Sequence, residues 1–361
     1  MNQHMKIVSL FSGIGGFELG IRNSRLNGKV VFSSEIDKYA TAAYLSNFED
    51  NNLKGDITKI CEKDIPDHDL LVAGFPCQAF SIAGRQKGFN DTRGTLFFDI
   101  ARILKEKKPK FFLLENVKNL VSHDNGETFK TIIKILNEVG YTIDFTVINS
   151  VEAGLPQNRE RTYIVGIRDG VSDEIKLDKR NKKINELKSN FKYCGFEFFN
   201  QLKFDNKQLY IKDIITEEKD DRYLITNDNI VNFLENSKFN ETGECCDKIV
   251  KLFDLPRDVW NDLERQRRVY SIYGISPTIL ARSDTTKVYI SNGEKSYIRK
   301  FTPRENFKLQ GFDDKFIDNI IINSAVSMTQ QYKQAGNAVS PPVITGIINH
   351  FIKYMEDYYG V

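Results

Sequence analysis

The sequence lacks any apolar stretch near the ~20 residues that a membrane-spanning helix needs, and its first apolar run covers only residues 7–11. We therefore expect neither an integral membrane protein nor a secretory signal peptide. Cysteine is scarce, and its positions show neither the spacing of a disulfide framework nor that of a zinc site. This pattern favours the reducing cytoplasm and predicts no metal. The cysteines are Cys61, Cys77, Cys194, Cys245 and Cys246.

A strong charge of either sign is also missing. The 51 lysines and arginines nearly balance 49 aspartates and glutamates, so the net charge is +2. A nucleic-acid partner therefore cannot be inferred from the net charge, and any basic surface must come from local clustering. Internal repeats and low-complexity tracts are absent as well. With 361 residues, 40% of them hydrophobic, the chain can form a substantial core in roughly two domains.

From residue 6 to about residue 170, apolar strand-like runs alternate with amphipathic helix-like runs. Strands are predicted over 6–10, 30–34, 69–73, 110–114, 141–149 and 162–168, and helices over 17–23, 37–48, 96–107 and 128–139. Alternation at this spacing predicts an α/β fold with a doubly wound sheet.

The pattern changes after Arg168. A lysine-rich stretch follows, and beyond it short β-like runs are separated by turn signals, which indicates a second, smaller domain. Near the C-terminus, an apolar helical run returns. We predict a catalytic and cofactor-binding domain over 1–195, completed by 337–361, a smaller and mostly β or irregular domain over 196–302, and a hinge over 303–336.

Cys77 is the strongest candidate nucleophile. It follows a Gly-Phe-Pro turn at the end of the apolar run 70–73, so a strand should deliver the thiol at its carboxyl end. A buried structural cysteine is the alternative interpretation. The next segment, 81–94, could close over a substrate as a lid, with Arg85 and Arg93 on phosphates.

A second strand-like run, 111–114, ends at Glu115. A carboxyl group at a strand end against an apolar wall should have a raised pKa, which suits it to hold a proton near neutral pH. The alternative is a helix cap. Farther along, Arg159 and Arg161 precede another strand and, in an extended segment, point to the same face. One could reach the site and the other a surface acid.

A glycine turn near the N-terminus could hold a cofactor. A strand-like run leads into Gly13, Gly15 and Gly16, and the following helix offers its N-terminus to a ligand. A plain tight turn is the alternative. Glu35 ends the next strand about 20 residues on, where an acid can bind ribose hydroxyls. Asp56 could add a further contact or only cap a helix.

Taken together, these motifs resemble those of the DNA (cytosine-5)-methyltransferase family, and they occur in the family's order. They are Phe11-x-Gly-x-Gly-Gly16, Glu35, Asp56, Gly74-Phe-Pro-Cys-Gln78, Glu115-Asn-Val117, Gln157-x-Arg-x-Arg161, Pro303-Arg304-Glu305 and Gly336-Asn337-Ala-Val339. The resemblance covers nearly the whole chain except about 171–267. Residues 65–119 look especially like one bacterial member, which has serine where this chain has Ala83.

The resemblance implies a Rossmann-like sheet that binds S-adenosylmethionine, releases S-adenosylhomocysteine and needs no metal. The smaller domain would recognise the target. The Cys77 thiolate would add to C6 of a cytosine flipped out of duplex DNA, and C5 would then attack the methyl group. Glu115 would hold the base and stabilise the charge that develops on its ring. Arg161, with Arg159 beside it, would help to hold the base and the intermediate.

The resemblance also implies a cofactor pocket. Phe11 would stack on the adenine, Glu35 would bind the ribose, Asp56 would bind the adenine amine, and Asn337 would line the same pocket. The predicted cofactor-binding residues are Phe11, Gly13, Gly15, Gly16, Glu35, Ile36, Asp56, Ile57, Pro76, Leu96, Asn337 and Ala338.

For DNA, Arg268 and Thr278 lie in a segment that looks like the start of the family's recognition loop. Arginine reads guanine well in the major groove, so we predict that Arg268 contacts a guanine or an adjoining phosphate. Arg85 and Arg93 complete the predicted DNA-binding set. The expected partner is double-stranded DNA with a short recognition site. A cognate restriction endonuclease that acts on the same site could be a second partner. We expect a bacterial cytoplasmic monomer, associated with the nucleoid through DNA.

Three other functions remain open. A tRNA cytosine-5 methyltransferase could share the fold, although the variable region between Gln157 and Pro303 favours duplex DNA. A non-catalytic DNA-binding relative would have no need of a nucleophile at Cys77. A plain Rossmann oxidoreductase would leave Cys77 and Glu115 unexplained.

Overall fold

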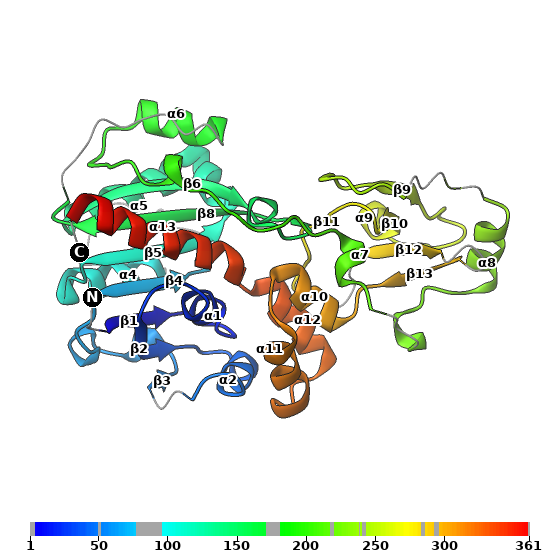
Figure 1. Cartoon of the computed structure of the whole chain (residues 1–361), viewed down its shortest axis with the longest axis horizontal. Helices are drawn as coiled ribbons and strands as arrows, with labels where there is room; N and C mark the ends of the chain where they lie inside the picture. The colour runs from blue at the N-terminus through cyan, green and yellow to red at the C-terminus, as the bar shows by residue number, and fades with distance from the viewer. Residues whose placement is uncertain are drawn as a thin grey trace.

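The computed structural model describes residues 4–49, 52–76, 96–170, 181–216, 220–237, 239, 243–282, 286–291 and 296–359. Cys77, Arg85 and Arg93 lie outside these residues. Figure 1 shows a large lobe built around one broad sheet, a smaller lobe with its own sheet, and a group of helices between them.

The large lobe contains a seven-stranded sheet in the order β3-β2-β1-β4-β5-β8-β6. Its strands are β1 (Met5–Leu10), β2 (Gly28–Ser34), β3 (Leu53–Lys54), β4 (Leu70–Gly74), β5 (Phe111–Val117), β6 (Tyr141–Asn149) and β8 (Glu160–Arg168). Neighbours from β3 to β5 are parallel, whereas β8 runs antiparallel to both β5 and β6. The predicted α/β fold is confirmed, with an antiparallel edge that includes β6.

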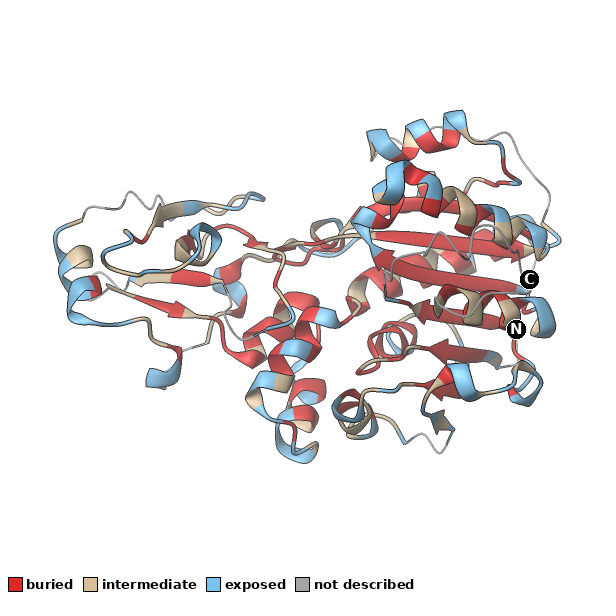
Figure 2. Cartoon of the chain, turned by 180° about the vertical axis from the view of Figure 1, so that it is seen from behind, coloured by how far each residue is buried: buried red, intermediate tan, exposed pale blue. Residues whose placement is uncertain are grey.

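Helices cover both faces of this sheet. They are α1 (Gly16–Arg22), α2 (Lys38–Leu45), α4 (Leu96–Lys107), α5 (Glu127–Glu138), α6 (Lys182–Asn190) and α13 (Pro341–Tyr359). Successive strand residues point to opposite faces. Leu71 therefore packs in a cluster with residues of α4 and α5, while Leu70 and Val72 pack with α1 and α13. Such two-sided burial explains why the strands are continuous apolar runs, and Figure 2 shows them buried along most of their length.

Residues 191–204 return to the β6 edge. Gly195 bridges Ile143, and Asp144 accepts hydrogen bonds from the backbone of Phe198 and Phe199 and from Lys188 Nζ. Phe196, Phe198, Phe199 and Phe204 belong to the α1–α13 side of the core, whereas Phe191 and Tyr193 pack on the α4–α5 side. Because these contacts place 196–204 on the large lobe, we propose that the smaller domain begins near residue 205 rather than 196.

The smaller lobe holds a four-stranded sheet in the order β13-β12-β10-β9. Its elements are α7 (Ile211–Ile214), α8 (Asp228–Glu235), β9 (Lys251–Asp254), α9 (Glu264–Arg267), β10 (Arg268–Ser271), β12 (Lys287–Ser291) and β13 (Ser296–Lys300). A small core of Ile230, Leu255, Val269 and Ile298 lies against this sheet. The predicted mostly β or irregular character of this part is therefore confirmed.

The two lobes are joined by a short ladder and by helices. The ladder pairs β7 (Gln157–Asn158) with β11 (Ser276–Pro277), and the helices are α10 (Pro303–Gln310), α11 (Asp314–Asp318) and α12 (Met328–Asn337). Gly336 lies in the last turn of α12. A side chain there would stand 2.5 Å from the backbone of Ala281, so glycine permits close packing of the lobes.

Over the described ranges, no helix has both the length and the apolar character required to cross a membrane.

Candidate functional site

Among the predicted site residues that the structure describes, the glycine turn, Glu35, Glu115 and Arg161 lie at the carboxyl edge of the large sheet. Gly74, at the end of β4, pairs with Glu115 on β5, and Leu10, at the end of β1, pairs with Ala73. Asn116 Nδ2 donates a hydrogen bond to the carbonyl of Phe75 at 2.8 Å, which ties the turn after β4 to β5. The chain then leads through the exposed Pro76 toward Cys77. Parallel strands of open α/β sheets hold ligands at this edge.

Glu115 is buried, and its only described charged contact within 4 Å is Arg161, whose Nε lies 3.2 Å from Oε1. Burial raises the pKa of Glu115, while the charges of Arg161 and Arg159 act in the opposite direction and are outweighed. The carboxyl group can therefore keep a proton at a higher pH than an exposed glutamate does. This is the electrostatic setting expected of a group that donates a hydrogen bond to a substrate.

Arg159 is buried beside the same carboxyl group. Its Nη2 donates to the carbonyl of Ala338 at 2.9 Å, but Nε and Nη1 have no hydrogen-bond partner among the described residues. Burial, with the nearby charge of Arg161, lowers the pKa of Arg159 to about 9. Unpartnered buried donors are costly, so a ligand that offers an acceptor here would stabilise this guanidinium group. Both arginines thus face the site, whereas the sequence allowed one to pair with a surface acid.

The glycine turn has the backbone conformation of a ligand cradle. Phe11, Gly13 and Gly15 all have positive φ, at 56°, 57° and 96°, and glycine adopts such angles without a Cβ penalty. Glu35 closes the turn, because its Oε2 accepts from Gly13 N at 2.8 Å and its Oε1 accepts from Asp37 N at 2.7 Å. A carboxylate held in this way at the end of β2 is positioned for hydroxyl groups of a ligand.

The remaining cofactor candidates surround this turn less closely. Asp56 Oδ1 accepts from the backbone and hydroxyl of Thr58 and caps the short helix Ile57–Lys59, while Oδ2 lies 3.7 Å from Lys59 Nζ. Ile57 is buried, whereas Ile36 is 72% exposed and offers an apolar surface. Leu96 begins α4 and is half-buried; Asn337 is exposed and Ala338 is buried.

Arg268 begins β10, and its Nη2 lies 2.6 Å from Glu264 Oε1. This hydrogen bond raises the pKa of Arg268. Thr278 Oγ1 donates to the carbonyl of Asn158 at 2.6 Å, so Thr278 fastens the smaller lobe to the large one. Arg265 and Arg282 line a small cavity with these two residues. Neither Arg265 nor Arg282 was predicted from the sequence, although the run Arg265-Gln-Arg267-Arg268 is a local basic cluster.

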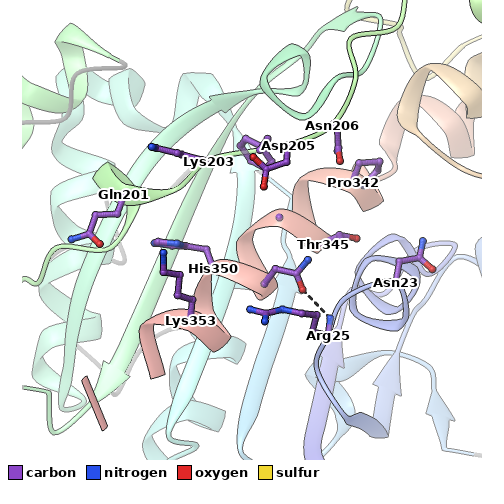
Figure 3. A pocket seen from close by; sticks show the side chains of 13 residues that line it. Asn23, Arg25, Gln201, Lys203, Asp205, Asn206, Pro342, Thr345, His350 and Lys353 are labelled. Atoms are coloured by element: carbon purple, nitrogen blue, oxygen red, sulfur yellow. Dashed lines mark hydrogen bonds between the residues drawn. The ribbon is translucent and has the colours of Figure 1, made fainter. Parts of the chain in front are cut away.

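A groove of about 620 Å³ lies away from the carboxyl edge of the large sheet. It is bounded by the end of α1, residues 201–206 and α13 (Figure 3). In it, Asn349 Oδ1 accepts from the backbone of Arg25 at 2.8 Å. No predicted site residue lines it. The chemistry of the carboxyl edge therefore lies elsewhere than in this groove.

Residues 5–353 match the model of the family described as C-5 cytosine-specific DNA methylase. The type II methyltransferase M1.ScrFI of Lactococcus lactis subsp. cremoris is 42% identical over 97% of this chain and 79% of its own length. M.HhaI of Haemophilus parahaemolyticus is 36% identical over 93% of this chain and 90% of its own length. It is the bacterial member that residues 65–119 resemble. DNMT2 of Spodoptera frugiperda has the same fold, with a TM-score of 0.66 and 20% identity. The match covers 97% of this chain and 100% of that structure.

Proposed function

The chain belongs to the C-5 cytosine-specific DNA methylase family and is a DNA (cytosine-5)-methyltransferase, and from this premise we propose that it methylates one cytosine within a short duplex site. The observation that carries the proposal is the group formed by Glu115 on β5 with Arg159 and Arg161 at the start of β8, beside the strand that leads to Cys77. A raised carboxyl pKa and unpartnered guanidinium donors suit a neutral, flipped-out base.

In the proposed reaction, the Cys77 thiolate forms a bond to C6 of the flipped cytosine, and electron density moves to C5. Protonated Glu115 donates to N3 and accepts from the exocyclic amine, which stabilises the charge that develops on the ring. Arg159 and Arg161 offer donors to the carbonyl oxygen of the base. S-adenosylmethionine, when bound, supplies an electrophilic methyl group. C5 takes the methyl group and loses its proton, for which we propose water as the acceptor, and the C6–S bond breaks to release the thiolate of Cys77.

The glycine turn fits S-adenosylmethionine. Gly13 and Gly15 allow close backbone approach, Glu35 presents a held carboxylate for the ribose hydroxyls, and Phe11 stands at the turn with its ring half-buried. Asp56 and the exposed Ile36 would take the adenine. We propose that S-adenosylhomocysteine is the product and that no metal takes part.

Replacing Glu35 with alanine should weaken S-adenosylhomocysteine binding about 10- to 100-fold, since a charged hydrogen-bond acceptor contributes roughly 1.5–3 kcal/mol. Isothermal titration calorimetry of the purified variant measures this. Glu62→Ala is the matched control, because Glu62 pairs with Arg102 at 2.7 Å instead of with the glycine turn. Equal affinity in the wild type and Glu35→Ala would show that Glu35 does not bind the ligand.

Replacing Arg268 with alanine should weaken binding to the duplex site that the enzyme recognises by about 1–3 kcal/mol if the side chain reads guanine. Duplexes with single-base changes should then show a smaller loss at the one position that Arg268 reads. The exposed Arg257, replaced by alanine, controls for loss of charge in the same lobe. Equal weakening on every duplex would assign Arg268 to a phosphate instead.

The proposed function is tested by bisulfite sequencing of a plasmid library treated with the purified protein and S-adenosylmethionine. We expect one cytosine in one short motif to be methylated, and no methylation with Cys77→Ser. The absence of any methylated DNA cytosine would contradict the proposal, and methyl transfer to tRNA in preference to duplex DNA would favour the RNA-modifying alternative.

We propose further that the enzyme is the modification half of a restriction–modification pair, which the names of its type II relatives support. A cognate endonuclease would act on the same site. Since one chain supplies every proposed site residue, we propose a monomer that works in the bacterial cytoplasm on nucleoid DNA.

A further inference from the structure

We infer that Gln157 couples target recognition by the smaller lobe to the placement of the catalytic arginines. The inference rests on the proposed function and makes Gln157 a positioning residue for that reaction. In the sequence, Gln157 belonged to a motif but had no role of its own.

The side chain of Gln157 touches both sides of the junction between the lobes. It is fully buried. Its Oε1 accepts from the backbone of Ile279 in the smaller lobe at 3.1 Å, and its Nε2 donates to the carbonyl of Leu309 in α10 at 3.0 Å. One amide group therefore links β7, the segment after β11 and a connecting helix. A side chain of similar volume without the amide would lose both links.

The contact with Ile279 continues a ladder. Ser276 and Pro277 pair with Gln157 and Asn158, and Ser276 N donates to the carbonyl of Pro156 at 2.8 Å. These bonds align the segment 276–279 with β7, residue by residue. A displacement of that segment is therefore transmitted to β7.

The same segment reaches the basic cavity of the smaller lobe. The carbonyl of Thr278 accepts from Arg265 Nη2 at 3.3 Å, and both residues line that cavity together with Arg268. A DNA phosphate or base edge engaged by these arginines would thus act on the residue adjacent to Ile279. The path from these arginines to Gln157 therefore runs through Thr278 and Ile279.

The other end of the path is catalytic. Arg159 and Arg161 follow Gln157 at alternate positions, and alternate residues of an extended chain share a face. The backbone of Arg159 is also held by Asn149 Oδ1 at 3.1 Å, and Arg161 contacts Glu115. A shift of β7 would move these guanidinium groups relative to the base, and a misplacement of about 1 Å can cost roughly 100-fold in rate.

Gln310 provides a matched control. It is also fully buried, and its amide is also used twice: Nε2 donates to the carbonyl of Ala335 at 2.8 Å, and Oε1 accepts from Ser340 Oγ at 2.7 Å. Neither partner belongs to the smaller lobe. Replacing Gln310 with methionine therefore removes the same chemistry without cutting the proposed path.

The experiment compares the wild type, Gln157→Met and Gln310→Met on two unmethylated duplexes. One carries the correct target site, and the other has one changed base outside the target cytosine. Gln157→Met should lower kcat on the correct duplex about 10- to 100-fold and reduce the ratio of kcat between the two duplexes, because only the correct contact is transmitted. The Kd for the correct duplex should change less than about threefold, since DNA contacts are retained. Gln310→Met should keep the wild-type ratio.

An unchanged ratio in Gln157→Met, or an equal loss of ratio in Gln310→Met, would overturn the inference while leaving the proposed function intact. Absence of DNA methylation by the wild type would instead overturn the proposed function. If Gln157→Met does not fold, Gln157→Glu serves in its place: it keeps an acceptor for Ile279 N–H and loses the donor to Leu309. Gln157→Glu should keep most of the wild-type ratio of kcat between the two duplexes, even though its free energy of unfolding falls. A large loss of that ratio with little loss of stability would contradict the coupling.

Discussion

Replacing Glu115 with glutamine should lower kcat for DNA methylation by about two to four orders of magnitude. Glutamine has nearly the same shape, so the packing beside Arg161 is preserved, but it cannot supply a carboxyl proton to the base. DNA binding should persist, because the charges that meet the phosphates are unchanged. Single-turnover methylation and a binding titration on the same duplex separate the two effects.

The pH dependence of this variant provides a second readout. Because burial raises the pKa of Glu115, the wild type should lose activity as pH rises through that pKa and the carboxyl group loses its proton. Glu115→Gln should lack this limb. By linkage, the folded chain binds this proton more tightly than the unfolded chain, so its contribution to stability is present at low pH and is lost as pH rises through the folded-state pKa.

Glu160→Gln is the matched control for Glu115. Glu160 lies at the same sheet edge but on the opposite face, where it pairs with Lys118 at 2.7 Å and is partly exposed. It should methylate DNA at nearly the wild-type rate. If Glu115→Gln also retained the wild-type rate and the alkaline limb, Glu115 would have no catalytic role.

Replacing Arg299 with methionine should lower the free energy of unfolding by about 3–5 kcal/mol, because it leaves a buried carboxylate without its partner. Arg299 and Glu305 are both fully buried. Nη2 lies 2.6 Å from Oε1 and Nη1 lies 2.8 Å from Oε2 of the glutamate. Arg299 also donates to the carbonyl of Thr216 at 3.0 Å, so the pair ties together β13, α10 and the chain that enters the smaller lobe.

Urea unfolding measures this loss, and the adjacent Arg304 provides the comparison. Arg304 forms partly exposed ion pairs with Asp314 and Asp318, so Arg304→Met should cost no more than about 1 kcal/mol. Replacing both members of the buried pair, by Arg299→Met with Glu305→Leu, should recover part of the loss. Equal losses in Arg299→Met and Arg304→Met would show that the buried ion pair contributes no more to the free energy of unfolding than the exposed ion pairs of Arg304 do.

The sequence by itself determined the local elements and predicted a set of site residues. Apolar runs and amphipathic periods predicted the helix over 96–107 and the strand over 141–149, and both are present with those bounds. The motifs around Glu35 and Glu115 predicted an acid at the end of each strand, because strand ends in such a sheet converge on one edge. These signals are local, so a single chain read from end to end is enough to find them.

The tertiary structure alone decided how distant segments meet. Arg159 bonds to Ala338, which is 179 residues away, and Gln157 bonds to Ile279, which is 122 residues away. Residues 196–204 pack on the large sheet, and a helical position at 336 is occupied by glycine, where the backbone of Ala281 leaves no room for a side chain. Such contacts depend on complementary shape and paired hydrogen bonds between segments that carry no local trace of each other. For that reason the sequence predicted individual site residues, and only the folded chain showed which distant segments contact them.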